Sequence, residues 1–167
     1  MYTADNASFL NVNPKGNVPA IKLPCGALLN EGSATLQYVA DLAPASGLAP
    51  ANGTVARYQL QNVLSFLGTE VHASFGPLFG PGSDEFKAAQ RAKVATKFTL
   101  LTEALGDKPF LMGAALTVAD LYASVIISWS GYVGVDLAPF PKLAEYMARV
   151  KAVPAVAEAQ KIMDAAA

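Results

Sequence analysis

Few side chains in this chain are suited to acid–base or nucleophilic chemistry. The 167 residues include one histidine, His72, and one cysteine, Cys25. An imidazole can exchange a proton near neutral pH, and a thiolate is a nucleophile. Cys25 lies in a turn-type segment, Pro24-Cys25-Gly26, rather than at a helix N-terminus that would stabilise a thiolate, so we interpret it as a bystander. A lone histidine on a helix is commonly structural, and residue type alone leaves the role of His72 open.

Two short segments could bind a ligand through backbone groups. Glu31-Gly32-Ser33 stands at the start of a helical pattern, where free N–H groups and the helix dipole favour an anion. The same residues also fit a simple helix cap with an acidic first turn. Val18-Pro19 opens a short strand pattern, and on local sequence this proline is an ordinary edge-strand residue. Neither a Ser-His-Asp set, paired carboxylates nor a Gly-rich phosphate loop is recognisable.

The first fifty residues carry the only strand signals. Val18 to Leu23 and a run beginning at Ala27 predict two short strands, and the turn chemistry between them predicts a hairpin. Helical spacing follows from Ala34 and stops at Asp41-Leu42-Ala43-Pro44. A two-stranded sheet is marginal in water, so we expect this hairpin to need support from elsewhere. Residues 45–52 have the composition of a linker, and we expect a domain boundary there.

Beyond Gly53 the pattern is helical. Apolar residues recur three or four apart from Val55 to Val71, and Gly76-Pro77 is expected to break or kink this helix. Ser83 is a predicted N-cap of a long amphipathic helix. One face of that helix carries Phe86, Val94, Phe98, Leu101 and Leu105.

Three further helix starts are visible. Thr117-Val118-Ala119-Asp120 matches a capping box with Asp in place of Glu, and the helix behind it is apolar on nearly all sides. Pro141 and Pro154 each suit the first turn of a short helix. We therefore predict an all-helical bundle of about five helices, with the capped helix in its middle.

Composition limits the functional classes. Hydrophobic residues make up 53% of the chain and charged residues 15%, which predicts a substantial core and a thin polar surface that favours burial against another subunit. Twelve basic residues face thirteen acidic ones without a basic run, so nucleic acid is not expected as a partner. One cysteine and one histidine make a metal centre improbable. Neither a secretory signal nor a membrane span of about 20 apolar residues is recognised, and a cytoplasmic protein is expected.

The order and spacing of several segments resemble a known enzyme family. Asn13 to Ile21, Leu28 to Ala34 and Gln37 to Asp41 look like the second half of a glutathione transferase N-terminal domain. Glu70-Val71-His72, followed by Phe75 to Phe79, is similar to the first bundle helix of the bacterial beta class. The capping box and Leu121 resemble the central helix found across that superfamily. The resemblance covers the chain from about Ala4 to the C-terminus.

The resemblance implies an α+β, mostly α fold. Residues 1–44 would form a partial thioredoxin-like, glutathione-binding domain, made of the hairpin and one helix, and residues 53–167 an all-helical C-terminal domain. In the family, a strand, a helix and a second strand that hold the catalytic cysteine, serine or tyrosine precede the position of Met1. The resemblance therefore implies a truncated chain that begins just before a short helix at Asp5 to Val12.

The same resemblance assigns ligand contacts. It implies that the Val18–Pro19 bond is cis, which turns the N–H and C=O of Val18 outward to pair with the cysteinyl backbone of glutathione. The γ-glutamyl carboxylate would bind at Gly32 and Ser33, and Glu31 would pair with the ligand's ammonium. His72 would be the catalytic residue beside the thiol. Two further site positions depart from the beta-class pattern, with Ala73 in place of Lys and Ser65 in place of Asn.

The implied activity is conjugation of the glutathione thiol to electrophilic small molecules, a detoxification reaction, in a homodimer. Glutathione would be a co-substrate, and neither a cofactor nor a metal would be needed. Phe75, Phe79 and Trp129 would form an apolar pocket for the electrophile, although such residues are also typical of a bundle core. The alternative is a non-catalytic glutathione-transferase-like scaffold for binding or dimerisation, which the implied truncation, Ala73 and Ser65 favour. A third reading is that the protein begins upstream of Met1 and is an ordinary enzyme.

Overall fold

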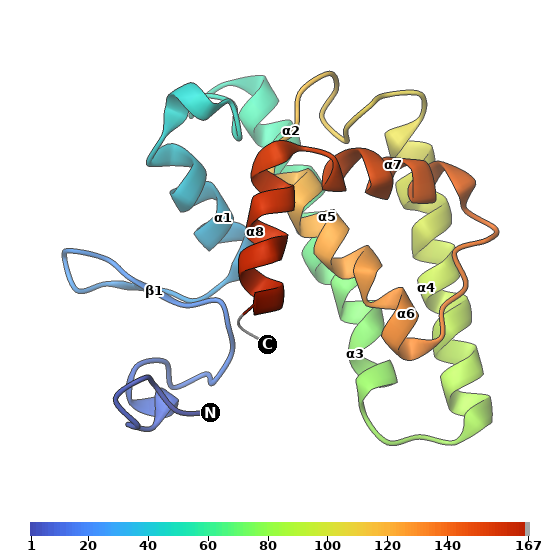
Figure 1. The fold of residues 1–167 in the computed structure, drawn as a ribbon, viewed down its shortest axis with the longest axis horizontal. Coiled ribbons are helices and arrows are strands. Elements are labelled where there is room, and N and C mark those ends of the chain that lie inside the picture. The colour runs from blue at the N-terminus through green and yellow to red at the C-terminus, as the bar shows by residue number, and fades with distance from the viewer. Residues whose placement is uncertain (166–167) are drawn as a thin grey trace.

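The computed structural model describes residues 1–165 and is mostly helical (Figure 1). A small N-terminal unit, with a hairpin and one helix, lies against one side of an all-helical bundle. This arrangement confirms the α+β, mostly α fold that the sequence predicts. In chain order the elements are η1 (Phe9–Asn11), β1 (Ile21–Lys22), β2 (Leu28–Leu29), α1 (Gly32–Asp41), η2 (Pro44–Ser46), α2 (Val55–Phe66), η3 (Leu67–His72), α3 (Ala73–Phe79), α4 (Asp84–Leu105), α5 (Val118–Ser128), α6 (Ser130–Val133), α7 (Pro141–Lys151) and α8 (Pro154–Ala165).

The predicted hairpin is present, with strands shorter than expected. β1 and β2 pair antiparallel, with Ile21 opposite Leu29 and Lys22 opposite Leu28. The turn between them contains Gly26 at a φ of 87°, a conformation that glycine adopts without steric cost. Cys25 is exposed in this turn. The hairpin extends away from the bundle, as Figure 1 shows.

The prediction of a helix from Asp5 to Val12 is wrong for most of that span. Only the single 3-10 turn η1 forms, at Phe9–Asn11. Before it, the hydroxyl of Thr3 accepts a hydrogen bond of 3.1 Å from the N–H of Ala7, and Asn6 lies at a φ of 63°. Side chains that bond to nearby backbone groups offer the chain an alternative to the helix, and here that alternative is the one adopted.

The predicted linker is attached to the bundle. η2 occupies its start, and the carbonyl of Leu48 accepts a hydrogen bond of 2.9 Å from the N–H of Val118 at the start of α5. Leu48 and Ala49 pack against the core. The division into domains at 1–44 and 53–167 stays a prediction.

The first bundle helix runs without a break from Val55 to Phe79, as α2, η3 and α3 in succession. The hydroxyl of Thr54 caps its start by accepting from the N–H of Arg57 at 3.2 Å. Of the break or kink expected at Gly76-Pro77, the break is wrong, because Pro77 lies inside α3, two residues before its end. A proline so near the C-terminus removes little of the helix's hydrogen bonding. η3 is a π-helical segment, a rare form that is often found at functional sites.

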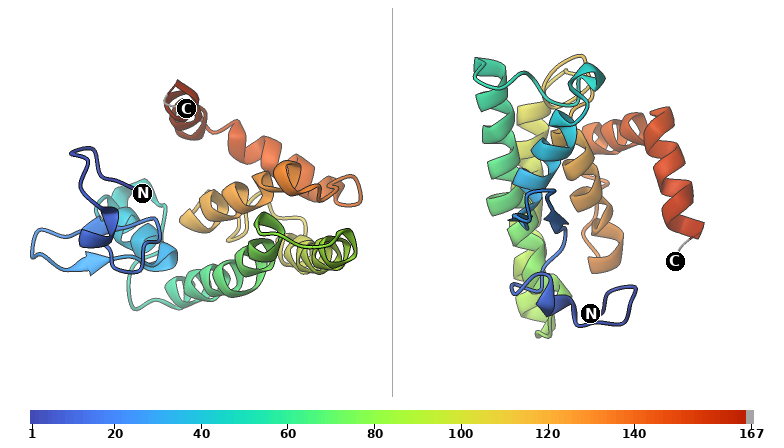
Figure 2. Two further views of the ribbon diagram at one scale, coloured as in Figure 1. Left: turned by 90° about the horizontal axis from the view of Figure 1, so that it is seen from below. Right: turned by 90° about the vertical axis from the view of Figure 1, so that its left-hand side faces the viewer.

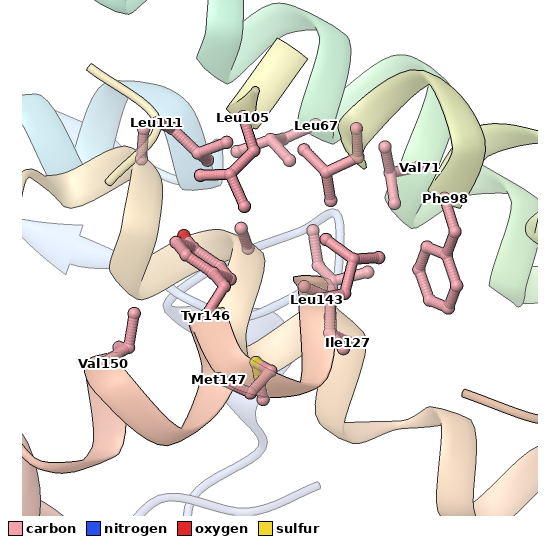
Figure 3. Packing of buried hydrophobic residues seen from close by; sticks show 14 of the residues in the cluster. Leu67, Val71, Phe98, Leu105, Leu111, Ile127, Leu143, Tyr146, Met147 and Val150 are labelled. Atoms are coloured by element: carbon pink, nitrogen blue, oxygen red, sulfur yellow. The ribbon is translucent and has the colours of Figure 1, made fainter. Parts of the chain in front are cut away.

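The hydrophobic core lies between this helix and α4, α5 and α7 (Figure 3). The predicted N-cap at Ser83 is confirmed, since its hydroxyl accepts from the N–H of Phe86 at 3.2 Å. Four of the five apolar residues predicted on one face of α4 are buried, while Phe86 is 41% exposed. α5 contacts the first bundle helix, α7 and α1, so it occupies the middle of the bundle as predicted.

The capping box at the start of α5 is confirmed and is part of a larger buried cluster. The carboxylate of Asp120 accepts from the N–H of Thr117 at 2.8 Å and from the N–H of Leu111 at 2.7 Å. It also accepts from the hydroxyl of Tyr146 on α7 at 2.9 Å. Burial and this carboxylate raise the pKa of Tyr146 far above its ordinary value. Asp120 therefore joins the loop before α5 to α7, beyond its local role as a cap.

Pro141 and Pro154 begin α7 and α8, as predicted. α7 presents a buried face to the core, whereas no residue of α8 is buried. α8 packs chiefly against α7 and stands apart from the other bundle helices (Figure 2). Within residues 1–165, no helix has the length and apolar character that crossing a bilayer requires.

Candidate functional site

A hollow of about 540 Å³ lies between the N-terminal unit and the first bundle helix. Six of the residues predicted to bind or activate glutathione line it together, namely Val18, Pro19, Glu31, Gly32, Ser33 and His72. The other lining residues are Asn17, Ser65, Gly68, Thr69, Ala73 and Tyr122. Segments far apart in the sequence therefore meet at one site, and all of the predicted glutathione contacts lie in it.

The loop before β1, residues 13–20 and called the Val18 loop below, forms one wall of the hollow. The Val18–Pro19 bond is cis, as expected, and Val18 is 61% exposed. The loop is held by Asn13, which is fully buried and whose side-chain nitrogen donates to the backbone oxygen of Asn17 at 2.7 Å. The side-chain oxygen of Asn13 accepts from the side chain of Asn30 at 2.9 Å. Since Asn30 directly precedes Glu31, this buried amide fixes the Val18 loop relative to the start of α1.

The N-terminus of α1 forms the second wall. Glu31 is its N-cap residue, and the Glu31 side chain makes no capping hydrogen bond to the first turn. The N–H groups of a first turn lack partners within the helix, so those at Gly32 and Ser33 are available to an anion. The Glu31 carboxylate pairs with the Lys15 ammonium at 2.6 Å, and both side chains are more than half exposed. A ligand ammonium could exchange with Lys15 there.

His72 and Tyr122 meet on the bundle side. Nδ1 of His72 lies 2.7 Å from the Tyr122 hydroxyl, within hydrogen-bond distance. Trp129 packs edge-on against the His72 ring, with centroids 4.7 Å apart. Partial burial lowers the pKa of His72 below its usual 6.5. Burial raises the pKa of Tyr122, and the negative charge of Glu31 raises it further. Both rings are therefore neutral at physiological pH.

Tyr122 is a residue of the hollow that the sequence does not indicate. It falls on the apolar helix α5, where an aromatic residue suggests packing, and its contact with His72 spans fifty positions. A methyl group added at Gly68 would lie 3.7 Å from the Tyr122 hydroxyl and 3.8 Å from the Ser33 hydroxyl. These two hydroxyl groups therefore approach Gly68 from different elements. The capping box at Thr117 is the one sequence signal that places Tyr122 near the start of the helix whose C-cap residue is Trp129.

The residues predicted for an electrophile pocket gather around Trp129. The rings of Phe75 and Phe79 each lie 5.7 Å from that of Trp129, in edge-on geometry. Phe75 is fully buried and belongs to the core, whereas Phe79 is 57% exposed and Trp129 is half-buried. Only Phe79 and Trp129 can therefore present surface to a bound molecule, with Phe75 supporting them. Binding of an electrophile here stays a prediction.

Metal chemistry has no visible basis in the part of the chain that the structure describes. No cluster of three or more His, Cys, Asp or Glu side chains occurs within residues 1–165. Cys25 lies in the hairpin turn and is not part of the hollow's lining.

Comparison with known proteins identifies the family. Residues 84–149 match the model of the glutathione S-transferase C-terminal domain. The chain is 36% identical over 152 residues to the glutathione S-transferase GstA of Escherichia coli O157:H7, a match that covers 90% of this chain and 76% of the relative. The chain therefore belongs to the glutathione S-transferase family.

Two solved glutathione S-transferase structures are similar to this chain. A sphingomonad glutathione S-transferase in complex with glutathione is 45% identical, with a TM-score of 0.91 over 96% of this chain and 81% of the other. A bacterial beta class glutathione S-transferase from Sphingomonas chungbukensis is 42% identical, with a TM-score of 0.90 over 96% of this chain and 81% of the other. The beta class similarity stated from the sequence is thus confirmed.

Proposed function

We propose that this chain is a glutathione transferase that binds glutathione in the hollow between the Val18 loop, the start of α1 and η3. One observation carries the proposal: the Val18–Pro19 segment, the open N-terminus of α1 and the single histidine line the same hollow. The tripeptide carries carboxylates, an ammonium, amide groups and a thiol, and each wall offers a matching partner.

The binding mode follows from the chemistry of the walls. The backbone groups of Val18 pair with the cysteinyl amide of glutathione. The γ-glutamyl carboxylate is held by the N–H groups at Gly32 and Ser33, where the helix dipole adds to the attraction. The ammonium of the same γ-glutamyl residue pairs with Glu31 in place of Lys15. These contacts put the cysteinyl sulfur between the Val18 loop and His72.

His72 acts on the thiol. A hydrogen bond from the imidazole stabilises the thiolate over the thiol, so the thiol proton is released to water at lower pH. The thiolate then attacks an electrophilic carbon, a sulfur–carbon bond forms, and the leaving group departs with its electron pair. The exposed faces of Phe79 and Trp129 would hold an apolar electrophile next to the sulfur.

A second candidate function rests on two lining residues. Ser65 and Ala73 line the hollow, and neither can offer the charged or long polar contact that the beta class carries at these positions. A non-catalytic binding or dimerisation scaffold would retain the hollow and the fold without conjugation. With either function, we propose that the protein acts in the cytoplasm, where an unpaired thiol such as Cys25 stays reduced.

The test combines an activity assay with a binding assay. We expect the chain to conjugate glutathione to a chloronitrobenzene above the background rate, and titration calorimetry to show saturable glutathione binding. His72→Gln should lower the rate about tenfold or more with little change in the dissociation constant. Asn11→Asp, an exposed change outside the hollow, is the matched control. Binding without turnover would establish a binding scaffold in place of the enzyme, and absence of binding would reject both the enzyme and the glutathione-binding scaffold, leaving the dimerisation scaffold.

We further propose a homodimer formed through the outer face of α2 and α4. A hollow of about 760 Å³ lies on this face, and most of its lining is apolar, from Val55 and Tyr58 on α2 to Leu100 and Leu101 on α4. Val55 is 74% exposed, Tyr58 61% and Leu100 43%. Contiguous exposed apolar surface of this kind is typical of a protein–protein interface. A second copy would cover it.

A further inference from the structure

The single histidine of the hollow contacts two aromatic side chains, Tyr122 on α5 and Trp129 directly after that helix. The Tyr122 hydroxyl lies 2.7 Å from Nδ1, and the Trp129 ring packs edge-on at 4.7 Å. His72 belongs to η3 and Tyr122 to α5, so this contact links two separate elements of the bundle. Within residues 1–165, no protein group hydrogen-bonds to the other ring nitrogen, Nε2.

We propose that Tyr122 is a positioning residue that sets the tautomer of His72, so that Nδ1 accepts a hydrogen bond and Nε2 carries the proton toward the bound sulfur. The catalytic role inferred for Tyr122 rests on the proposed function, whereas the assignment of the His72 tautomer does not. It makes His72 a hydrogen-bond donor to the thiolate rather than a base that removes the thiol proton.

The direction of the hydrogen bond follows from the two partners. A neutral imidazole carries one proton, and the nitrogen without it is a strong acceptor. A phenol is a better donor than acceptor, so the arrangement in which the Tyr122 hydroxyl donates to Nδ1 is the stronger one. In that arrangement Nε2 carries the proton. The partial burial of both rings keeps them neutral, which is consistent with this assignment.

The nearby carboxylates do not hydrogen-bond to the pair, and the charge of Glu31 raises the pKa of Tyr122, which favours its protonated hydroxyl. Glu31, across the hollow, pairs with Lys15, and Glu70, on η3 beside His72, pairs with Lys97 of α4 at 2.7 Å. Neither carboxylate hydrogen-bonds to the His72 ring, so the partner that fixes its tautomer is the Tyr122 hydroxyl.

The fixed tautomer has a consequence for the reaction. When glutathione binds, its thiol proton leaves to water, because Nε2 is already protonated and cannot accept it. The Nε2–H group then donates to the thiolate and stabilises it until the sulfur–carbon bond forms. Loss of the Tyr122 hydroxyl would let His72 populate both tautomers, and the Nδ1–H form offers the sulfur a lone pair instead of a donor.

The experiment uses the fact that the chain has one histidine, so its imidazole nitrogen signals need no assignment. Long-range proton–nitrogen NMR at about pH 8, well above the usual imidazole pKa of about 6.5, reports the tautomer ratio without any ligand. We expect the Nε2–H form to dominate in the native protein. Tyr122→Phe, which keeps the ring, should shift the ratio about fivefold toward the Nδ1–H form. Tyr132→Phe, which removes a hydroxyl from a side chain that is 84% exposed, should leave the ratio unchanged.

A native spectrum dominated by Nδ1–H, or an unchanged ratio in Tyr122→Phe, would overturn the proposal. Because this readout needs no glutathione, it separates failure of the tautomer assignment from failure of the proposed function. In an active enzyme, Tyr122→Phe should raise the pKa of the bound thiol, seen as thiolate absorbance against pH, and lower kcat about fivefold with KM for glutathione unchanged. A change in KM alone would indicate a merely structural role and contradict the catalytic part.

Discussion

The buried amide of Asn13 accepts a hydrogen bond of 2.9 Å from the side chain of Asn30, and this contact joins the two glutathione-binding walls proposed for the hollow. Asn13 belongs to the Val18 loop, and Asn30 directly precedes the first residue of the α1 cap. One fully buried side chain therefore helps to set the separation of the two walls, together with the side chain of Asn17, which donates to the carbonyl of Asn30 at 2.8 Å. Ligand affinity should depend on Asn13 although it does not line the hollow.

Asn13→Asp tests this dependence at constant side-chain size. The side-chain nitrogen of Asn13 donates to Asn17 at 2.7 and 2.8 Å, and an oxygen in its place would face two acceptors. We expect the glutathione dissociation constant to rise about tenfold, which corresponds to about 1.4 kcal/mol. Titration calorimetry measures it, with Asn11→Asp as the exposed control. An affinity within twofold of the native value, in a variant with native circular dichroism, would show that the walls are fixed by other contacts.

Asp120→Ala should cause a large loss of stability. Its carboxylate is fully buried and accepts from two backbone N–H groups and from the hydroxyls of Thr117 and Tyr146. Each buried donor left without a partner costs about 1–3 kcal/mol, and we expect the free energy of unfolding to fall by about 4 kcal/mol. Tyr146→Phe removes only one donor and should cost about 1 kcal/mol. Urea unfolding followed by circular dichroism measures both, and equal losses would contradict the central role of the carboxylate.

Acid should weaken the attachment of α1 to the bundle. The guanidinium of Arg57, 2% exposed, pairs with Asp41 at the end of α1 and also donates to the carbonyl of Pro50 at 2.7 Å. The hydrogen bond from Arg57 holds the pKa of Asp41 below its usual 3.8. A lowered pKa in the folded state means that the stabilisation is complete above the unfolded value of 3.8 and is lost as pH falls through the folded value.

Asp41→Asn isolates this contribution. The difference in free energy of unfolding between the native protein and Asp41→Asn should be constant above about pH 5 and should shrink at lower pH. Asp136→Asn, at an exposed carboxylate without a cation partner among residues 1–165, is the control. Thermal unfolding across the pH range provides the measurement. Two variants with the same pH dependence would rule out the Arg57–Asp41 pair as its source.

The parts of the fold that were predictable from sequence carry local signals. The caps at Ser83 and Thr117 and the helix starts at Pro141 and Pro154 each depend on a few adjacent residues, and all four are present. The helix expected at Asp5 to Val12 fails because Thr3 and Asn6 favour a turn that competes with it. The break expected at Pro77 fails because a proline near the end of a long, well-packed helix disturbs little.

The lining of the candidate hollow was predictable, whereas the contact between His72 and Tyr122 was not. The resemblance to the family located Val18, Pro19, Glu31, Gly32, Ser33 and His72, and these residues line one hollow. Tyr122 was missed because its role depends on where η3 lies against α5, a tertiary relationship that no spacing in either segment encodes. Likewise, Asn13 belongs to a segment that carries the resemblance, and its hydrogen bonds to Asn17 and Asn30 could not be predicted from the sequence.

The proposed dimer face makes the last prediction. Leu100 on α4 and Tyr58 on α2 border the same apolar hollow and are 43% and 61% exposed. If a second copy covers this face, Leu100→Glu places an unpaired charge in a desolvated contact, which is strongly unfavourable. We expect sedimentation velocity to show a dimer for the native protein and a dimer dissociation constant raised more than tenfold in Leu100→Glu. Val125→Glu, at a residue of α5 that is 50% exposed outside this face, should leave the dimer intact. A monomeric native protein, or equal dissociation in both variants, would show that the interface lies elsewhere or does not form.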